Sequence, residues 1–307
     1  MIPLLLLASA AIGTIGKISS KTCSNIVSAR SNRLRYFLYL TLVGVVACLV
    51  FFVLNGFKIS FTPKTLYYAI AFSAVCVISM LCSVRLFKLS NISGAVVLSS
   101  FGSLIATSAA GFFVFHEEIS VRTLLKIGIM TVPSALTFFQ AGRKEKGKVK
   151  SINKGAKTKL ATLILLITAN GCASTVIIKL YNTASNVTSI NSMFFLTNAV
   201  IALGTSLVFA FFALKGRTDE ERKAQLKDSI SLFRPLPLLA IAGNTTTSNL
   251  GSLIGAILIK YMDISVYTPV SSAINILAGV FASFIFRERH DAIFYISALL
   301  ALVAVVI

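Results

Sequence analysis

The sequence has few charged residues, and acidic residues are the scarcest of them. Only 13% of the 307 residues are charged, and Asp and Glu total 10 against 29 Lys and Arg. An average soluble domain has about 25% charged residues, so this chain has too little polar surface to cover a soluble core of its size. With 56% hydrophobic residues it is also far from the composition of a disordered chain. We therefore expect a polytopic membrane protein.

Residue types that support catalysis or metal binding are equally scarce. The two histidines, His116 and His290, stand far apart, and the carboxylates are scattered. The five cysteines form no CxxC pair and lie mostly within apolar runs, which is typical of small core residues rather than of a disulfide framework or metal site. No GxSxG or HExxH motif occurs. We predict no catalytic residue, no metal site and no cofactor, and we do not expect an enzyme.

Uncharged runs long enough to cross a bilayer occur ten times, since a helix of about 20 apolar residues spans the hydrocarbon core. The predicted fold is all-α, with ten transmembrane helices. The first run lacks the positive n-region of a signal peptide, so a retained helix is favoured. The expected helices are 1–16, 36–57, 65–84, 89–115, 127–142, 160–178, 191–214, 235–259, 264–286 and 292–307.

Basic residues gather in alternate loops between these helices. In chain order, 23 of the 29 Lys and Arg lie in the odd-numbered loops, eight of them between Arg143 and Lys159. The positive-inside rule then places these loops in the cytoplasm and both termini outside. The net charge of +19 is thus an orientation signal, and nucleic acid is not an expected partner. The linker 143–159 is interpreted as a solvated topology determinant, with binding of anionic lipid headgroups as the alternative.

The linker separates two halves, residues 1–142 and 160–307, that share sequence features. The segment Phe113–Glu117 (FVFHE) matches Phe284–Glu288 (FIFRE) at an offset of 171, and Leu98–Ser100 matches Val270–Ser272 at 172. Each match falls at the same place in its helix. Because each half has five helices, the second half starts on the opposite side of the membrane. This predicts an inverted repeat, as in many secondary transporters, whose similar halves alternate around a midplane site.

The five-plus-five arrangement, with a serine-containing helix that ends in Phe-x-Glu in each half, resembles the drug/metabolite transporter superfamily, in particular its EamA-like members. The motif stretches are Val97–Ser120 and Pro269–Asp291, and the resemblance covers nearly the whole chain. It implies export of amino acids, metabolites or drugs, or exchange of nucleotide sugars and sugar phosphates. It also implies cytoplasmic termini, opposite to the orientation that the basic residues indicate.

The acidic residues all lie outside the middle of the expected spans. A proton-coupled exporter of cations needs a buried carboxylate that exchanges a proton for the cation. Permanent cations are therefore disfavoured as substrates, and a neutral, zwitterionic or anionic solute is favoured. Glu117 and Glu288 are interpreted as local caps, or as partners of Arg122 and Arg289, rather than as solute ligands.

Polar side chains at membrane depth must face protein or water, and they mark the candidate site. The densest run is Asn244–Asn249, within which Thr245 and Asn249 share a helix face with Ser252. Interhelical packing is the alternative reading for Ser and Thr, and snorkelling is the alternative for lysines near helix ends. The substrate-binding candidates are Thr245, Asn249, Ser252, Ser271, Asn275, Ser99, Ser103, Asn170, Lys17 and Lys260.

Together these features predict a secondary transporter that moves a small polar metabolite across a membrane by alternating access. The plasma membrane is the expected location, and the protein is expected to act as a monomer or homodimer. The expected partners are a small-molecule substrate and membrane lipids. A multidrug exporter is the main alternative, and a channel, a scramblase or a membrane enzyme is a weaker one.

Overall fold

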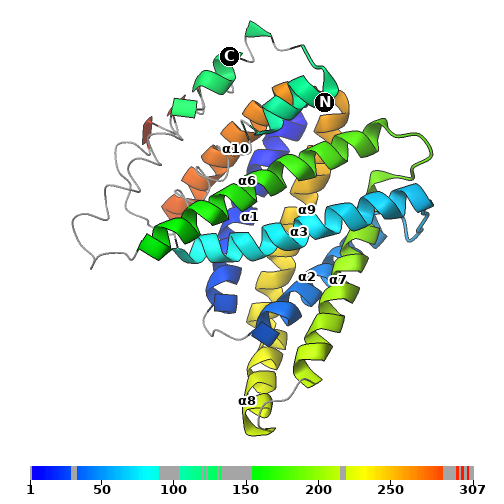
Figure 1. The fold of residues 1–307 in the computed structure, drawn as a ribbon, viewed down its shortest axis with the longest axis vertical. Coiled ribbons are helices and arrows are strands. Elements are labelled where there is room, and N and C mark those ends of the chain that lie inside the picture. Colours follow the sequence, from blue (N-terminus) through cyan, green and yellow to red (C-terminus); the bar gives the residue numbers. More distant parts are fainter. Residues whose placement is uncertain are drawn as a thin grey trace.

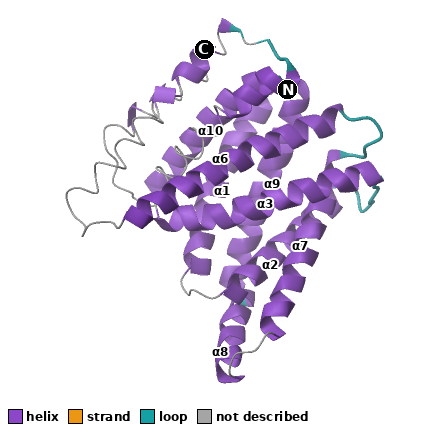
Figure 2. Cartoon of the chain, viewed as in Figure 1, coloured by secondary structure: helices purple, strands orange, loops and turns teal. Residues whose placement is uncertain are grey.

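The structure, a computed structural model, describes residues 2–28, 33–89, 154–214 and 219–285, most of 104–132 and a few residues after 294. Nearly all of these residues are helical, and none of them lies in a strand (Figure 2). The helical fold class is thus confirmed for the described part. The helices are α1 Ile2–Ser28, α2 Arg33–Leu54, α3 Pro63–Leu89, α6 Lys154–Thr183, α7 Ile190–Leu214, α8 Asp219–Ile230, η1 Ser231–Phe233 (3-10), α9 Pro235–Tyr261 and α10 Ile264–Ile285.

Five of these helices are long and apolar enough to cross a membrane, which makes the chain an integral membrane protein. Helices α6 and α9 also lie where spans were expected, with 30 and 27 residues. A further apolar helix covers Ala106–Phe115, inside the expected span 89–115. Most of 127–142 and 292–307 lies outside the described residues. The five spans are Ile2–Cys23, Leu34–Leu54, Pro63–Cys82, Ile190–Leu214 and Ile264–Ala282.

Several helix boundaries differ from those expected. Helix α1 continues to Ser28 instead of ending near residue 16, because Ile18, Cys23 and Ile26 carry its apolar pattern past Lys17. Helix α6 begins at Lys154, so the last residues of the linker 143–159 are helical. The linker's remaining residues lie outside the described part.

Helix α9 is the central helix of the bundle (Figure 1). It packs against α1, α2, α6, α7 and α10, while α2 pairs with α7 and α3 pairs with α6. The α2–α7 pair is especially close: a Cβ atom on Gly44 would lie 2.8 Å from the backbone nitrogen of Ala202. Small residues at such crossings let two backbones approach, which strengthens van der Waals packing in a membrane.

The two ends of α9 define the two ends of the bundle. Helix α8 and η1 directly precede Pro235 and mark the α8 end (Figure 1). Met262 and Asp263 connect α9 to α10 and mark the opposite end, here called the loop end. A helix of 27 residues such as α9 is about 40 Å long, so these ends are separated by roughly the thickness of a bilayer.

Apolar clusters fill the bundle toward each end. Near the loop end, Phe51 stacks on Phe194 with ring centroids 5.1 Å apart, and the same cluster includes Ile259 of α9. Near the α8 end, a second cluster contains Leu38 and Ile241. The polar run of α9 lies between these clusters. Polar side chains are therefore concentrated at the middle of the bundle, with apolar packing on both sides.

The outer surface is apolar as well. Leu4, Leu7, Leu203, Leu207 and Leu236 are each at least 66% exposed. Soluble monomers rarely expose large contiguous apolar patches, whereas leucine side chains facing lipid cost nothing. These side chains fit a surface in contact with acyl chains.

Candidate functional site

Two polar cavities lie in the middle of the bundle and share part of their lining. The first has a volume of about 340 Å³ and lies between α1, α9 and α10. The second has a volume of about 290 Å³ and lies between α1, α3 and α6. Lys17, Ser252 and Asn275 line both cavities. The three side chains come from α1, α9 and α10, so the shared wall joins the two halves of the sequence.

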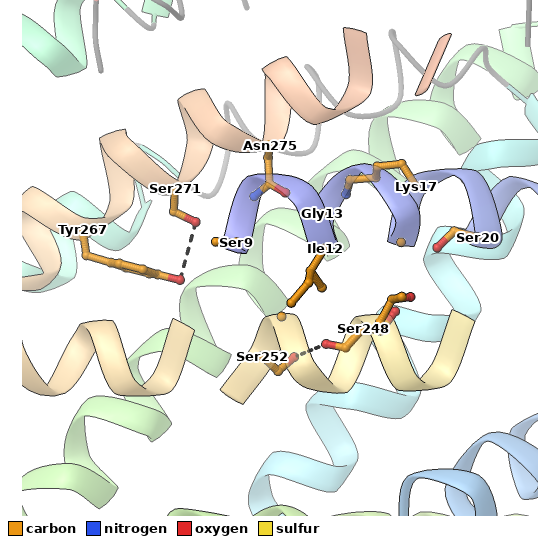
Figure 3. A pocket seen from close by; sticks show the side chains of 13 residues that line it. Ser9, Ile12, Gly13, Lys17, Ser20, Ser248, Ser252, Tyr267, Ser271 and Asn275 are labelled. Carbon is orange, nitrogen blue, oxygen red and sulfur yellow. Dashed lines mark hydrogen bonds between the residues drawn. The ribbon is translucent and has the colours of Figure 1, made fainter. Parts of the chain in front are cut away.

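The position of Lys17 in the structure differs from the one that we predicted from the sequence. It was expected near a helix end, where its ammonium group could snorkel to the interface. Because α1 continues for eleven residues beyond it, Lys17 lies well inside the span Ile2–Cys23. Figure 3 shows its side chain lying back along α1 toward Gly13, on the side where Asn275 projects from α10. This direction follows from the tilt of helical side chains toward the N-terminus.

Helix α9 presents two polar faces, and only one of them lines the first cavity. Thr247, Ser248 and Ser252 line it, and the Ser252 hydroxyl donates to the Ser248 carbonyl at 3.0 Å (Figure 3). The predicted residues Thr245 and Asn249 line neither cavity. Asn249 instead contacts α7.

The contact with α7 involves the side chain of Asn249, whereas the buried Thr245 hydroxyl has no hydrogen-bond partner among the described residues. The Asn249 amide donates to the Thr245 carbonyl at 2.8 Å, and its oxygen accepts from Asn198 of α7 at 3.4 Å. Thr245 is only 1% exposed. For Asn249 the observed contact is thus an interhelical one, as in the packing alternative, while the role predicted for Thr245 stays a prediction. Ser252 lies at the border of the two faces, which is why helical spacing alone grouped it with them.

Helix α10 contributes the predicted residues Ser271 and Asn275, together with Tyr267, which the sequence did not single out. The Ser271 hydroxyl lies 3.5 Å from the Tyr267 hydroxyl (Figure 3). A Cβ atom on Gly255 of α9 would lie 2.7 Å from that same tyrosine oxygen. Tyr267 therefore reaches from α10 to α9 and bounds the first cavity toward the loop end. Only a glycine at position 255 leaves room for it.

The second cavity receives its polar groups from α6 and α3. The predicted residue Asn170 lines it, and so do Ser174 and Ser79. The Ser174 hydroxyl donates to the Gly171 carbonyl at 2.9 Å, whereas Asn170 is buried. An amide buried in a membrane protein must find partners in protein or water, and the cavity supplies that environment.

Three predicted residues remain, namely Ser99, Ser103 and Lys260. Ser99 and Ser103 lie outside the described residues. Lys260 is exposed near the end of α9, with its ammonium 5.9 Å from the ring centroid of Tyr261. The structure thus brings Lys17, Asn170, Ser252, Ser271 and Asn275 together around the cavities.

Glu117 closes the loop end by capping a helix far away in the sequence. Its carboxylate accepts from the backbone amides of Ile264 and Ser265, at 2.9 and 2.8 Å, which are the first residues of α10. A Cβ atom on Gly111 would lie 2.7 Å from Glu117 Oε2, so the glycine makes room for the carboxylate. Amides in a helix's first turn lack partners within the helix, and the helix dipole favours an anion there.

The partners of Glu117 lie in the second half of the chain, so the cap is not local. Oε1 also lies 3.4 Å from the ammonium of Lys179. Burial raises the pKa of Glu117, but the amides of Ser265 and Ile264 and the Lys179 charge outweigh it, so the pKa is below its ordinary value. Arg122 and Glu288 lie outside the described residues.

Arg35 performs a similar role at the α8 end. Its guanidinium donates to the carboxylate of Asp228 at 3.1 Å, to the carbonyl of Asp228 at 2.8 Å and to the hydroxyl of Ser231 at 2.8 Å. It also reaches the Ile26 carbonyl at 3.1 Å. Arg35 is 6% exposed, so this is a buried connection between the α1–α2 region and α8.

The comparisons with known proteins show a shared fold. No protein-family model matches the sequence, and no curated protein matches it. The search of solved structures finds 27 matching chains. One of them, described as "Crystal structure of protein", superposes with a TM-score of 0.53 at 13% identity and covers 97% of this chain and 95% of its own. At that identity the likeness shows the fold alone.

Proposed function

We propose that this protein is a secondary transporter that moves a small polar metabolite across a membrane by alternating access. The single observation that carries the proposal is the pair of polar cavities that meet at Lys17, Ser252 and Asn275 in the middle of the bundle, between two apolar clusters. Polar and ionisable groups at membrane depth are costly, and they mark solute pathways. The ten-helix inverted repeat predicted from the sequence belongs to this proposal.

The contacts at the two ends of the bundle support the same mechanism. Glu117 and Lys179 join the two halves of the sequence at the loop end, and Arg35 and Asp228 join them at the α8 end. A carrier needs a closure on each side of its site, and the two must open in turn. Ion pairs between the halves can break and re-form as the halves rock.

The decisive test is counterflow in proteoliposomes. A metabolite that raises the Tm of the purified protein is loaded inside the vesicles, and uptake of the labelled solute is followed. A carrier accumulates label transiently against its gradient, because internal solute returns the site to the outside, whereas a channel only equilibrates it. Transient accumulation supports the proposal, and simple equilibration or the absence of any solute flux contradicts it.

A variant that fills the first cavity tests whether counterflow requires that cavity. Gly251 faces the first cavity, where the nearest atom to its Cβ position is an Ile12 methyl group at 3.8 Å. We expect Gly251→Leu to abolish counterflow by occupying the cavity. Gly204 has no atom within 4 Å of its Cβ position and lies on α7, away from both cavities, so Gly204→Leu should leave counterflow unchanged.

A further inference from the structure

We infer that the central site binds an anion, and that Lys17 is the group that binds the substrate's carboxylate or phosphate. This inference rests on the proposed function and narrows its substrate class. Among the described residues that line the two cavities, Lys17 carries the only formal charge. The juxtaposition that points to the ligand is one lysine at the shared wall of two cavities with hydrogen-bonding groups around it.

The ammonium group of Lys17 has no partner among the residues that the structure describes. No hydrogen bond or ion pair connects it to another residue within the described parts of the chain, although it lies inside a candidate span. A charge taken out of water without a counter-charge is strongly unfavourable. The usual solution at membrane depth is pairing with an opposite charge. A bound anion supplies that charge.

Two largely buried carboxylates in the described part of the chain have other partners than Lys17. Glu117 is held by the first amides of α10 and by Lys179 at the loop end. Asp228 binds Arg35 at the α8 end. Both ends of the bundle thus have paired charges, whereas Lys17 is the one charged residue among the described residues that line the cavities. A cationic solute would be repelled there, and a neutral solute would leave the lysine uncompensated.

The groups around Lys17 suit an oxyanion. Asn275 projects its amide from α10 toward the same space, and Ser252 borders it from α9 (Figure 3). Hydroxyl and amide groups donate hydrogen bonds to carboxylate and phosphate oxygens, and such charge-assisted bonds are about twice as strong as neutral ones. Other hydroxyls of the first cavity, among them those of Ser9 and Ser248, can form hydrogen bonds with the polar body of the solute.

The volumes restrict the size of this solute. At about 340 and 290 Å³ the two cavities lie at the lower end of ligand pockets, which run from about 300 to 1,000 Å³. The site therefore fits a small organic acid or a small phosphate ester better than a large amphipathic drug. Carboxylate and phosphate groups both offer negatively charged oxygens to Lys17. An experiment must therefore decide which of the two groups the site binds.

The test uses solutes that share one scaffold and differ in charge. Glycerate, glycerol 3-phosphate and glycerol are titrated against the purified full-length protein, with choline as a cation, and binding is read from Tm and from isothermal calorimetry. We expect glycerate, glycerol 3-phosphate or both to bind, with an affinity that falls as salt is added. Preference between the two identifies the anionic group. Binding by glycerol or choline alone, or by none of the four at millimolar concentrations, overturns the inference.

Substitutions then assign the binding to Lys17. Lys17→Gln should lower the affinity for the anion about tenfold or more, which is the usual effect of losing a charged hydrogen-bond partner. Lys17→Arg should keep most of the affinity. Lys260→Gln is the matched control, because it removes an exposed lysine far from the cavities. Equal anion affinity in Lys17→Gln and the unmodified protein would overturn the assignment.

A second variant keeps the test informative if Lys17→Gln fails to fold. Asn275→Asp places a carboxylate beside Lys17 with almost no change in shape. We expect this variant to raise Tm by pairing with the lysine and to lose anion binding. Retained anion binding in Asn275→Asp would contradict the inference. Counterflow of a neutral or cationic solute would overturn the anion site and leave the transporter proposal intact, whereas absence of counterflow for every solute would count against the transporter itself.

Discussion

Glu117 Oε1 and Lys179 Nζ lie 3.4 Å apart, which joins the end of the Ala106–Phe115 helix to the end of α6. Both side chains are largely buried, with 6% and 17% of their surfaces exposed. The lysine also approaches the Met262 carbonyl at 3.5 Å, and the glutamate caps α10. One carboxylate therefore holds three helices together at the loop end.

Removal of the Glu117 charge should destabilise the protein. In Glu117→Gln the side-chain amide presents an NH₂ group where Lys179 or an α10 amide needs an acceptor. Because hydrogen bonds to charged groups contribute about 1.5–3 kcal/mol each, we expect a loss of at least about 2 kcal/mol, measured by chemical unfolding in detergent micelles. The exposed neighbour Glu118 is the matched control, and Glu118→Gln should unfold like the parent. Similar unfolding of both variants would show that the cap contributes little.

The stability of the protein should also depend on pH, because Glu117 titrates. Its folded pKa is lowered, so its contribution is complete above the ordinary pKa of a glutamate, about 4.3. The contribution is lost as the pH falls from that value through the folded pKa. The difference in Tm between the parent and Glu117→Gln should therefore be largest near neutral pH and should shrink with acidification. A difference that stays constant down to the lowest accessible pH would assign the effect to shape rather than charge.

At the α8 end the same reasoning applies to Arg35. Replacement by methionine keeps the volume but leaves the Asp228 carboxylate without its buried cation. Breaking one partner of a buried pair costs about 3–5 kcal/mol, so Arg35→Met should lower the free energy of unfolding by that amount. Arg234 is exposed and directly precedes α9, which makes Arg234→Met the matched control. An Arg35→Met protein as stable as the control would show that the pair contributes no net stability.

If the two ends open in turn, weakening them should shift accessibility in opposite directions. In a cysteine-free background, Ser20→Cys and Ser271→Cys place thiols in the first cavity, on α1 and on α10. We expect Glu117→Gln to raise labelling by an impermeant reagent added from the loop end, and Arg35→Met to raise it from the α8 end. Reagent restricted to one face of oriented proteoliposomes makes the measurement. Equal changes from both faces would contradict alternating closure.

Much of the fold could be read from the sequence because apolar runs define helices directly. The expected helices 191–214, 235–259 and 264–286 differ by at most two residues at each end from α7, α9 and α10. The error at α1 arose because Lys17 was taken as a terminus. A lysine inside a span is unfavourable unless the protein provides a cavity, and a cavity is a property of several packed helices. Helix α8 was not predicted because its twelve residues are mostly polar and show no apolar face. Its position is fixed by contacts with Arg35, which lies far away in the sequence.

The site was predictable only in part, for a related reason. Polar residues in apolar runs identified Asn170, Ser271 and Asn275, all of which line the cavities. Helical spacing defines a face of α9 but not the neighbour that the face meets, so it could not separate Asn249, which contacts α7, from Ser248. The hydrogen bond between the Ile264 amide and Glu117 joins residues 147 positions apart in the sequence. No local sequence pattern predicts such a contact.

The contact between Gly255 and Tyr267 tests how the first cavity is closed toward the loop end. Gly255→Ala would place a methyl group 2.7 Å from the tyrosine hydroxyl, well inside van der Waals contact, so Tyr267 must move. Since overpacking in a core costs about 1–3 kcal/mol, we expect a lower Tm and faster solute leak through the loop end in proteoliposomes. Tyr267→Phe removes the clashing oxygen, and the double variant should regain Tm relative to Gly255→Ala alone. A Gly255→Ala protein with unchanged Tm, or a double variant no more stable than the single one, would show that Tyr267 does not bound the cavity at this glycine.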